Sequence, residues 1–366
     1  MKWVHPWDPH PPSLSRLLPE CIRPYPSFEG WFFRIVDPGK GMSFAVIIAT
    51  NYATWESHAT IVFCIDDGES PGTDGSKHGG RTHRVQAMAK DVRITSLSHL
   101  KDNTNSSEPL GFEWEAPELG KVIVRPNETK IDICVMGYHL EASLISKVHW
   151  NRSSSYKGPE GWARIIPIMP THWHVYSVGS EASYEFNNNN EMSIKSRGWA
   201  HEEKNWGVTF PAGHIWLQAI SDDNAAQVVF AGGYYKLGVI KTPYIGAMGY
   251  WSRSHQIDMR NIDIGTMFMD IRVNPREGKF SFKAVNPSYT ILITSSADPE
   301  SFCEPILAPV GKLEWKPACR ESYLANVKVE VYAHGVWGLP TNKTLVSTQT
   351  FSHAALEFGE DLMHED

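Results

Sequence analysis

The chain has 366 residues, of which 42% are apolar and 20% charged, ordinary values for a globular protein large enough for two domains. Its formal net charge of −7, without any concentrated Lys/Arg stretch, argues against a nucleic-acid partner. No apolar run approaches the roughly 18 residues of a membrane-spanning helix, and five cysteines without a Cys-x-x-Cys pair argue against a disulfide framework or a cysteine-only zinc site.

Residues 1–26 contain seven prolines. Proline lacks a backbone N–H and fixes its own φ, so this density excludes a helix or a central strand. We expect an extended N-terminal arm that lies on the body of the protein.

The remaining chain predicts strands. Residues 31–36 lead through the turn residues 37–41 (Asp-Pro-Gly-Lys-Gly) into an apolar segment at 43–50, and residues 58–65 form another apolar, β-rich run. Strict alternation, typical of half-buried strands, occurs in three later segments, at 130–135, 279–284 and 326–332. Long amphipathic helices are not visible, and the best helical candidate is a short piece of the C-terminal tail. These patterns predict an all-β, mostly antiparallel protein.

An internal similarity indicates two lobes. Residues 31–49 and 216–231 each contain an aromatic-led strand, a turn that bears Asp37 or Asp222, and an apolar return strand. We therefore predict an N-terminal lobe at 27–195 and a C-terminal lobe at 196–366. The tract of four asparagines just before residue 195, at 187–190, marks either this boundary or the tip of a hairpin.

The most informative segment for function is residues 199–218. It places Glu202, Glu203, Lys204 and Asn205 between Trp199 and Trp206, ahead of an aromatic-led strand. Charged residues flanked by large aromatics are typical of a water-poor pocket with a few placed polar groups. The alternative is a solvated polar loop.

Four blocks resemble the tocopherol cyclase family. They are residues 203–207 (Glu-Lys-Asn-Trp-Gly) with Phe210-Pro211 and Trp216-x-Gln218, residues 28–34 with Ser43-Phe44, residues 170–174, and residues 318–323. They occur in the family's order. The family usually has a tyrosine at the position of Phe32.

The resemblance implies two lipocalin-like antiparallel β-barrel or sandwich lobes and cofactor-free cyclisation of a lipophilic substrate. We accordingly predict a cyclase that acts on a prenylated aromatic, a meroterpenoid or a polyene, by proton-initiated or pericyclic closure. The alternatives are a hydratase on the same scaffold and a non-catalytic carrier of lipid or pigment. The partner expected is a hydrophobic small molecule, no cofactor or metal is expected, and a cytoplasmic location is the default. The sequence leaves the oligomeric state open.

The candidate catalytic residues follow from what ring closure requires. Glu203 is the expected acid, with a pKa that an apolar setting would raise, while Lys204 and Asn205 would donate hydrogen bonds to a substrate oxygen. Glu29 is a second carboxylate in an apolar block. The alternatives are that Glu203 and Lys204 form an ion pair at the lobe interface, and that Glu29 caps a strand end or pairs with Arg34.

Trp31, Trp206 and Trp216 are the expected cavity wall, since indole faces stabilise positive charge. They could equally be core residues.

The resemblance adds Trp173, His174 and Gln218 as substrate-binding candidates. His172 is a candidate acid, base or orienting residue, with a structural role as the alternative. On a strand, His172 and His174 would face one side and could hold zinc only with a third ligand. Three further residues of the matching blocks are predicted to be structural: Arg320, Glu321 and Tyr323.

Overall fold

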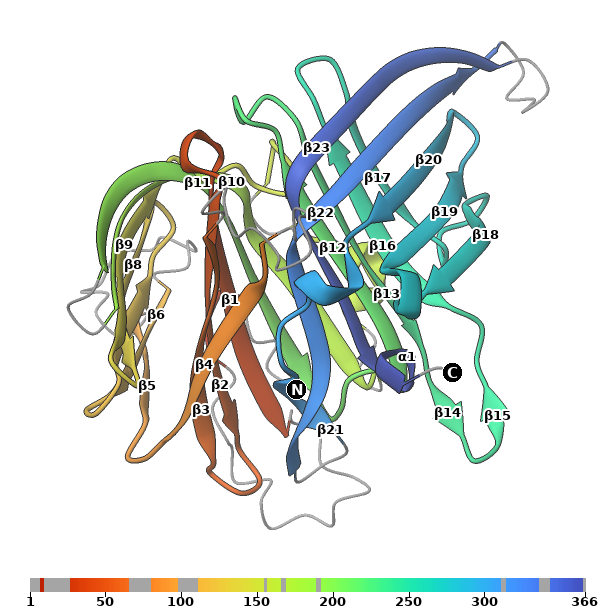
Figure 1. Cartoon of the computed structure of the whole chain (residues 1–366). Coiled ribbons are helices and arrows are strands. Elements are labelled where there is room, and N and C mark those ends of the chain that lie inside the picture. The colour runs from red at the N-terminus through yellow and green to blue at the C-terminus, as the bar shows by residue number, and fades with distance from the viewer. Residues whose placement is uncertain are drawn as a thin grey trace, which may run out of the picture.

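The computed structural model describes residues 7–9, 27–65, 80–97, 111–154, 157–165, 169–188, 192–310, 314–335 and 343–364. These residues form two large antiparallel sheets, which curl into a half-barrel and a nearly closed barrel (Figure 1). The prediction of an all-β, two-lobed protein is confirmed. Among the described residues, no helix is both long and apolar enough to cross a membrane.

The first sheet contains the strands of the N-terminal half. In spatial order they are β4 (Thr82–Ala89), β3 (Ser57–Ile65), β2 (Met42–Asn51), β1 (Phe28–Asp37), β11 (Met192–Gly207), β10 (Thr171–Asn188), β9 (Tyr138–Ile145), β8 (Glu128–Val135), β7 (Gly120–Val124), β6 (Phe112–Ala116) and β5 (Arg93–Ser96).

The second sheet contains the strands of the C-terminal half. In spatial order they are β17 (Gln256–Arg260), β16 (Ile245–Trp251), β13 (Gln227–Tyr234), β12 (Gly213–Ile220), β23 (Lys343–Glu360), β22 (Glu314–His334), β20 (Tyr289–Ser296), β19 (Lys279–Val285) and β18 (Met267–Asn274), with β21 (Ile306–Val310) also paired to β22. A separate ribbon joins β14 (Lys236–Leu237) to β15 (Ile240–Lys241), and the tail ends in the short helix α1 (Asp361–His364).

The internal similarity in the sequence corresponds to a structural one. The strand that opens each lobe lies between its hairpin partner and the last strand of the same lobe: β1 between β2 and β11, and β12 between β13 and β23. The turn after β1 follows its sequence chemistry, because the Asp37 side chain accepts from the Lys40 backbone N–H at 3.2 Å and Gly41 takes φ 63°. The two hairpins therefore open two similarly built lobes.

The passage between the sheets lies later than residue 195. Strand β11 pairs with β1 and β10 as far as Gly207, and β12 begins at Gly213, so the chain changes sheets at residues 208–212. The division into two domains stays a prediction. Asn187 and Asn188 end β10 and pair with Ser193 and Met192, so the asparagine tract belongs to a hairpin.

Four apolar clusters hold the described part of the molecule together, and the fourth, around Trp173 and Trp251, joins strands of both lobes. One fills the first lobe around Phe44 and Trp114, and one fills the second around Phe230 and Phe282. The third joins the lobes and includes Phe32, Trp216 and Tyr323. In the expected N-terminal arm, only residues 7–9 are described. Trp7 is fully buried in the first lobe, 4.7 Å from the Tyr176 ring, and the rest of the arm lies outside the described residues.

Candidate functional site

A cavity of about 430 Å³ lies between the two lobes. Its wall combines β1, β2 and β11 of the first lobe with β12, β13 and β21–β23 of the second. The wall is mainly apolar and aromatic, and includes Phe28, Phe32, Ile47, Phe210, Trp216, Ala308 and Trp315. Its size and lining are those of a small-molecule site at a domain interface.

Strand β11 presents Glu203 to this cavity. The indole N–H groups of Trp173 and Trp216 donate to its carboxylate at 3.0 and 3.1 Å. His201 Nε2 lies 2.8 Å from the same carboxylate, and Asn205 Nδ2 donates at 3.3 Å. Because an ionised carboxylate can only accept hydrogen bonds, this set of partners suits an anion at Glu203. Four of the predicted site residues, Glu203, Asn205, Trp173 and Trp216, thus meet at one place.

Two more carboxyl groups line the cavity close to Glu203. Glu321 on β22 and Glu357 on β23 are directly opposite each other across neighbouring strands, and both are buried. Burial, followed by the negative charge of Glu357, raises the pKa of Glu321 well above its usual range. Burial, with the nearby charge of Glu203, raises the pKa of Glu357 to about 7. Three adjacent buried carboxyl groups cannot all ionise at neutral pH, so this cluster retains a proton.

The two carboxyl groups of this pair have different neighbours. His214 Nε2 lies 2.8 Å from the Glu357 carboxyl group, and burial lowers the pKa of His214 to about 4, so this imidazole is neutral near pH 7. The buried guanidinium of Arg34 lies 4.7 Å from the centre of the Tyr323 ring, and its positive charge favours the ionised form of Glu321. Tyr323 OH donates to Glu321 at 2.5 Å. Glu321 is therefore influenced by a cation and a phenol hydroxyl group, whereas Glu357 is in contact with a neutral imidazole.

Lys204 does not face the cavity. Strand alternation turns it into the first lobe, where Lys204 and Glu29 form a fully buried ion pair. Lys204 Nζ donates to the Asp8 carbonyl at 2.8 Å, and Tyr52 OH donates to Glu29 at 2.5 Å. Neither the predicted ion pair between Glu203 and Lys204 nor that between Glu29 and Arg34 forms.

The same alternation accounts for two of the tryptophans. The Lys204 ammonium lies 5.0 Å from the Trp206 ring and 5.7 Å from the Trp31 ring. Trp31 touches the cavity wall, but its ring packs at 4.6 Å against Phe112 in the core of the first lobe. Both indoles stabilise a cation of the protein itself, and Trp216 is the residue of the three that meets the Glu203 carboxylate.

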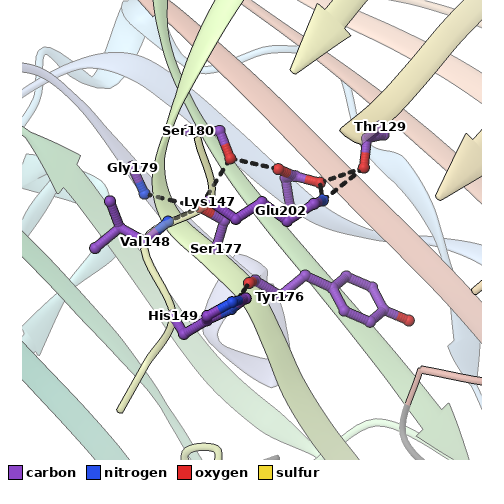
Figure 2. A network of polar contacts seen from close by, with 9 residues as sticks. All are labelled: Thr129, Lys147, Val148, His149, Tyr176, Ser177, Gly179, Ser180 and Glu202. Carbon is purple, nitrogen blue, oxygen red and sulfur yellow. Dashed lines mark hydrogen bonds and ion pairs between the residues drawn. The ribbon is translucent and has the colours of Figure 1, made fainter. Parts of the chain in front are cut away.

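Figure 2 shows where the neighbouring charge, Glu202, is directed. Its carboxylate forms an ion pair with Lys147 inside the first lobe and accepts from Thr129 at 2.6 Å and Ser180 at 2.5 Å. Burial lowers the pKa of Lys147. The charged run of β11 is therefore divided: Glu202 and Lys204 belong to the interior of the first lobe, and Glu203 belongs to the cavity.

The histidines flanking Trp173 also point away from the cavity. His172 Nδ1 lies 3.1 Å from Glu160, and its ring stacks on Trp206 at 5.1 Å. His174 is buried against Trp7 and Tyr176. Within the described ranges, no group of three His, Cys, Asp or Glu residues could hold a metal ion.

Gln218 lies beside the cavity without lining it. Its Oε1 accepts from Arg34 Nη1 at 2.5 Å, and Arg34 Nη2 donates to the His353 carbonyl at 2.5 Å. Arg34 thereby joins a strand of the first lobe to two strands of the second, and Gln218 is a partner in that connection.

Sequence reasoning missed several cavity residues. Glu357 has one local signal: it is the single charged residue in the apolar run from Ala354 to Phe358. Glu321 was predicted to be structural, yet it lines the cavity. His214 and His58, which also line it, lie in apolar strands without a distinguishing pattern.

Comparison with known proteins gives the same relationship as the sequence blocks. A tocopherol cyclase from Oryza sativa subsp. japonica, described as probable and chloroplastic, is 22% identical over 375 residues, covering 91% of this chain and 75% of the relative. Among solved structures, CghA with Sch210972 superposes with a TM-score of 0.54 at 10% identity, covering 97% and 94% of the two chains. Kievitone hydratase from Nectria haematococca gives 0.48 at 8% identity, covering 96% and 94%. At these identities the structures share the fold alone. The model of the tocopherol cyclase-like family matches residues 25–360, and the chain belongs to that family.

Proposed function

We propose that this protein is a cyclase that closes a ring in a lipophilic small molecule held between the lobes. The observation that carries the proposal is the cluster of Glu203, Glu321 and Glu357 in the wall of an apolar cavity. An apolar cavity can hold a flexible chain in one reactive conformation, which can contribute roughly 7–11 kcal/mol in favourable cases. The carboxyl cluster adds a proton donor and a fixed negative charge at one place in that site.

In the proposed reaction, Glu357 donates its proton to an alkene of the substrate. A carboxyl group with a pKa of about 7 is an effective general acid near neutral pH. The positive charge that develops on carbon is stabilised by the Glu203 carboxylate and by the Trp216 indole. A hydroxyl group of the substrate then attacks the cation, closes the ring and gives its proton to the Glu357 carboxylate, which restores the acid. The net change is an isomerisation, in which one O–H and one π bond are replaced by a C–H and a C–O bond.

The test is turnover of prenylated hydroquinones, prenylated phenols and linear polyenes by the purified protein in heavy water. We expect an isomeric cyclic product carrying one deuterium on carbon. A product heavier by one water would indicate a hydratase instead. Cyclisation at full rate without carbon-bound deuterium would indicate pericyclic closure, and tight binding without conversion of any member of the panel would indicate a carrier.

A further inference from the structure

The cavity wall also contains a buried histidine, His58 on β3, in the same sheet as Glu203. The register places Asn205, Gly30, Ala49 and His58 side by side across β11, β1, β2 and β3. Neighbouring strands lie about 4.8 Å apart, so His58 is roughly 14 Å from Asn205. Gly30 has no side chain and Ala49 has only a methyl group, so little side-chain volume projects from the wall between Asn205 and His58.

The hydrogen bonds behind His58 determine its tautomer. The Leu307 backbone N–H donates to Gln86 Oε1 at 3.2 Å, which identifies that atom as the amide oxygen. Thr60 Oγ1 lies 3.1 Å from the same oxygen and must donate its proton to it. Thr60 Oγ1 therefore faces His58 Nδ1, at 3.4 Å, as an acceptor. This arrangement favours the proton on Nδ1 and a free lone pair on Nε2.

The Nε2 atom is buried and has no hydrogen-bond partner among the described residues. Leaving such a group unpaired typically costs about 1–3 kcal/mol. Burial lowers the pKa of His58 to about 4, so the ring stays neutral and Nε2 remains an acceptor near pH 7. The Trp315 ring lies edge-on against this imidazole at 4.8 Å and also lines the cavity. Because Nε2 is buried, a hydrogen bond from a ligand to it requires a side-chain movement at this point of the wall, where the Trp315 indole is held by donating to the Glu56 carbonyl at 3.2 Å.

We propose that His58 Nε2 accepts a hydrogen bond from a hydroxyl group of the molecule bound in the cavity. The ligand class is an uncharged, mainly apolar compound with a hydroxyl donor at the end remote from the carboxyl cluster. A carboxylate or an ether offers no donor to the lone pair of Nε2. The inference rests on the proposed use of the cavity as a substrate site and extends it to the chemistry of the substrate.

The tautomer is tested directly by ¹⁵N NMR of histidine-labelled protein, with His58 assigned by its loss in His58→Asn. We expect the Nδ1–H form in the wild type and a mixture of tautomers in Thr60→Val, which removes the acceptor facing Nδ1. An Nε2–H form in the wild type would overturn the proposal.

Binding is tested with 1-decanol and its methyl ether, measured by displacement of a fluorescent apolar probe. One neutral hydrogen bond is worth about a 3- to 10-fold change in affinity. The alcohol-to-ether affinity ratio should therefore fall by that factor in His58→Leu and partly in Thr60→Val. His139→Leu, which alters a partly exposed histidine paired with Asp132 far along the sheet from the cavity lining, is the matched control and should leave the ratio unchanged.

An unchanged ratio in a folded His58→Leu protein would contradict the proposal. Neither measurement depends on turnover, so both can succeed when cyclisation fails, and both can fail when cyclisation is established.

Discussion

At the scale of single residues, the site is defined by how three chemically identical side chains differ in their partners. Glu203 accepts from two indoles and an amide, which suits an anion. Glu357 contacts a neutral imidazole and lies beside two other carboxyl groups, which suits a protonated acid. One proton donor and one fixed charge therefore arise from one residue type, because the hydrogen-bond partners and neighbouring charges of these side chains differ.

The first prediction concerns Glu357 as the acid. Glu357→Gln keeps the shape and removes the proton, so turnover should fall by roughly 100-fold or more. In the wild type, turnover should decrease above pH 7 as Glu357 loses its proton, and the residual activity of the variant should lack this step. Steady-state rates between pH 5 and 9 test both statements. Glu185→Gln, at a partly exposed position of β10, should behave like the wild type.

The second prediction concerns stability. The pKa of Glu357 is about 7 in the folded protein and 4.5 as its ordinary value, so the folded state binds this proton more tightly. The resulting stabilisation is complete below pH 4.5 and is lost as the pH rises through 7. Relative to Glu357→Gln, the wild type should lose on the order of 2–3 kcal/mol of unfolding free energy between pH 5 and 8.

Urea denaturation of both proteins at each pH measures this difference. The comparison between the two proteins cancels the contribution of the buried His58, and repeating it in the His214→Gln background removes that of His214, which contacts Glu357 directly. A difference that is constant with pH would show that Glu357 has an ordinary pKa in the folded state.

At the scale of elements, strand β11 assigns its consecutive charges to two different environments. Glu203 contributes to the cavity, whereas Lys204 and Glu29 form an ion pair inside the first lobe. Removing one partner of a buried pair leaves the other charge uncompensated, which typically costs about 3–5 kcal/mol. The two faces of β11 should therefore respond differently to substitution.

The third prediction follows from that difference. Lys204→Met should lower the unfolding free energy by about 3–5 kcal/mol, and the double variant Glu29→Gln/Lys204→Met should recover part of the loss. Glu203→Gln should lower turnover by roughly 100-fold with a much smaller effect on the melting temperature. Urea denaturation and steady-state rates give the two readouts. Additive losses at Glu29 and Lys204 would mean that the pair is not coupled.

The strands also show which features of the structure could be predicted from the sequence. The alternation of apolar and polar residues, together with the residue types in the turns, was sufficient to predict the β1–β2 and β12–β13 hairpins, because these signals come from residues that are close together in the sequence. The orientation of Lys204 was not predicted, since the segment was read as a pocket block and not as a strand with two faces. Glu357 was missed because its neighbours Glu321 and Glu203 come from distant strands. Only the pairing of whole sheets brings the three carboxyl groups together.

At the scale of the whole molecule, the two lobes form the cavity jointly. Phe32 of β1 meets Trp216 of β12 at 4.9 Å, and Arg34 bonds Gln218 across the same interface. The first lobe contributes Glu203, and the second contributes Glu321 and Glu357. Neither lobe holds the complete carboxyl cluster, so the proposed chemistry depends on their association.

The fourth prediction uses Gly30, which lines the cavity on β1. A Cβ atom there would lie 3.4 Å from Ala49 Cβ, an ordinary contact, so larger side chains would extend into the cavity. The series Gly30→Ala, Gly30→Val and Gly30→Leu should weaken 1-decanol binding progressively, by at least about tenfold for leucine, since one methylene is worth roughly 0.8 kcal/mol of burial. The melting temperature should change little, because the added atoms occupy free volume.

Ile47→Ala, which removes apolar volume from the same wall, is the opposite control and should weaken binding without blocking bulkier probes. A folded Gly30→Leu protein that binds 1-decanol as tightly as the wild type would place the ligand site inside one lobe and not between the two.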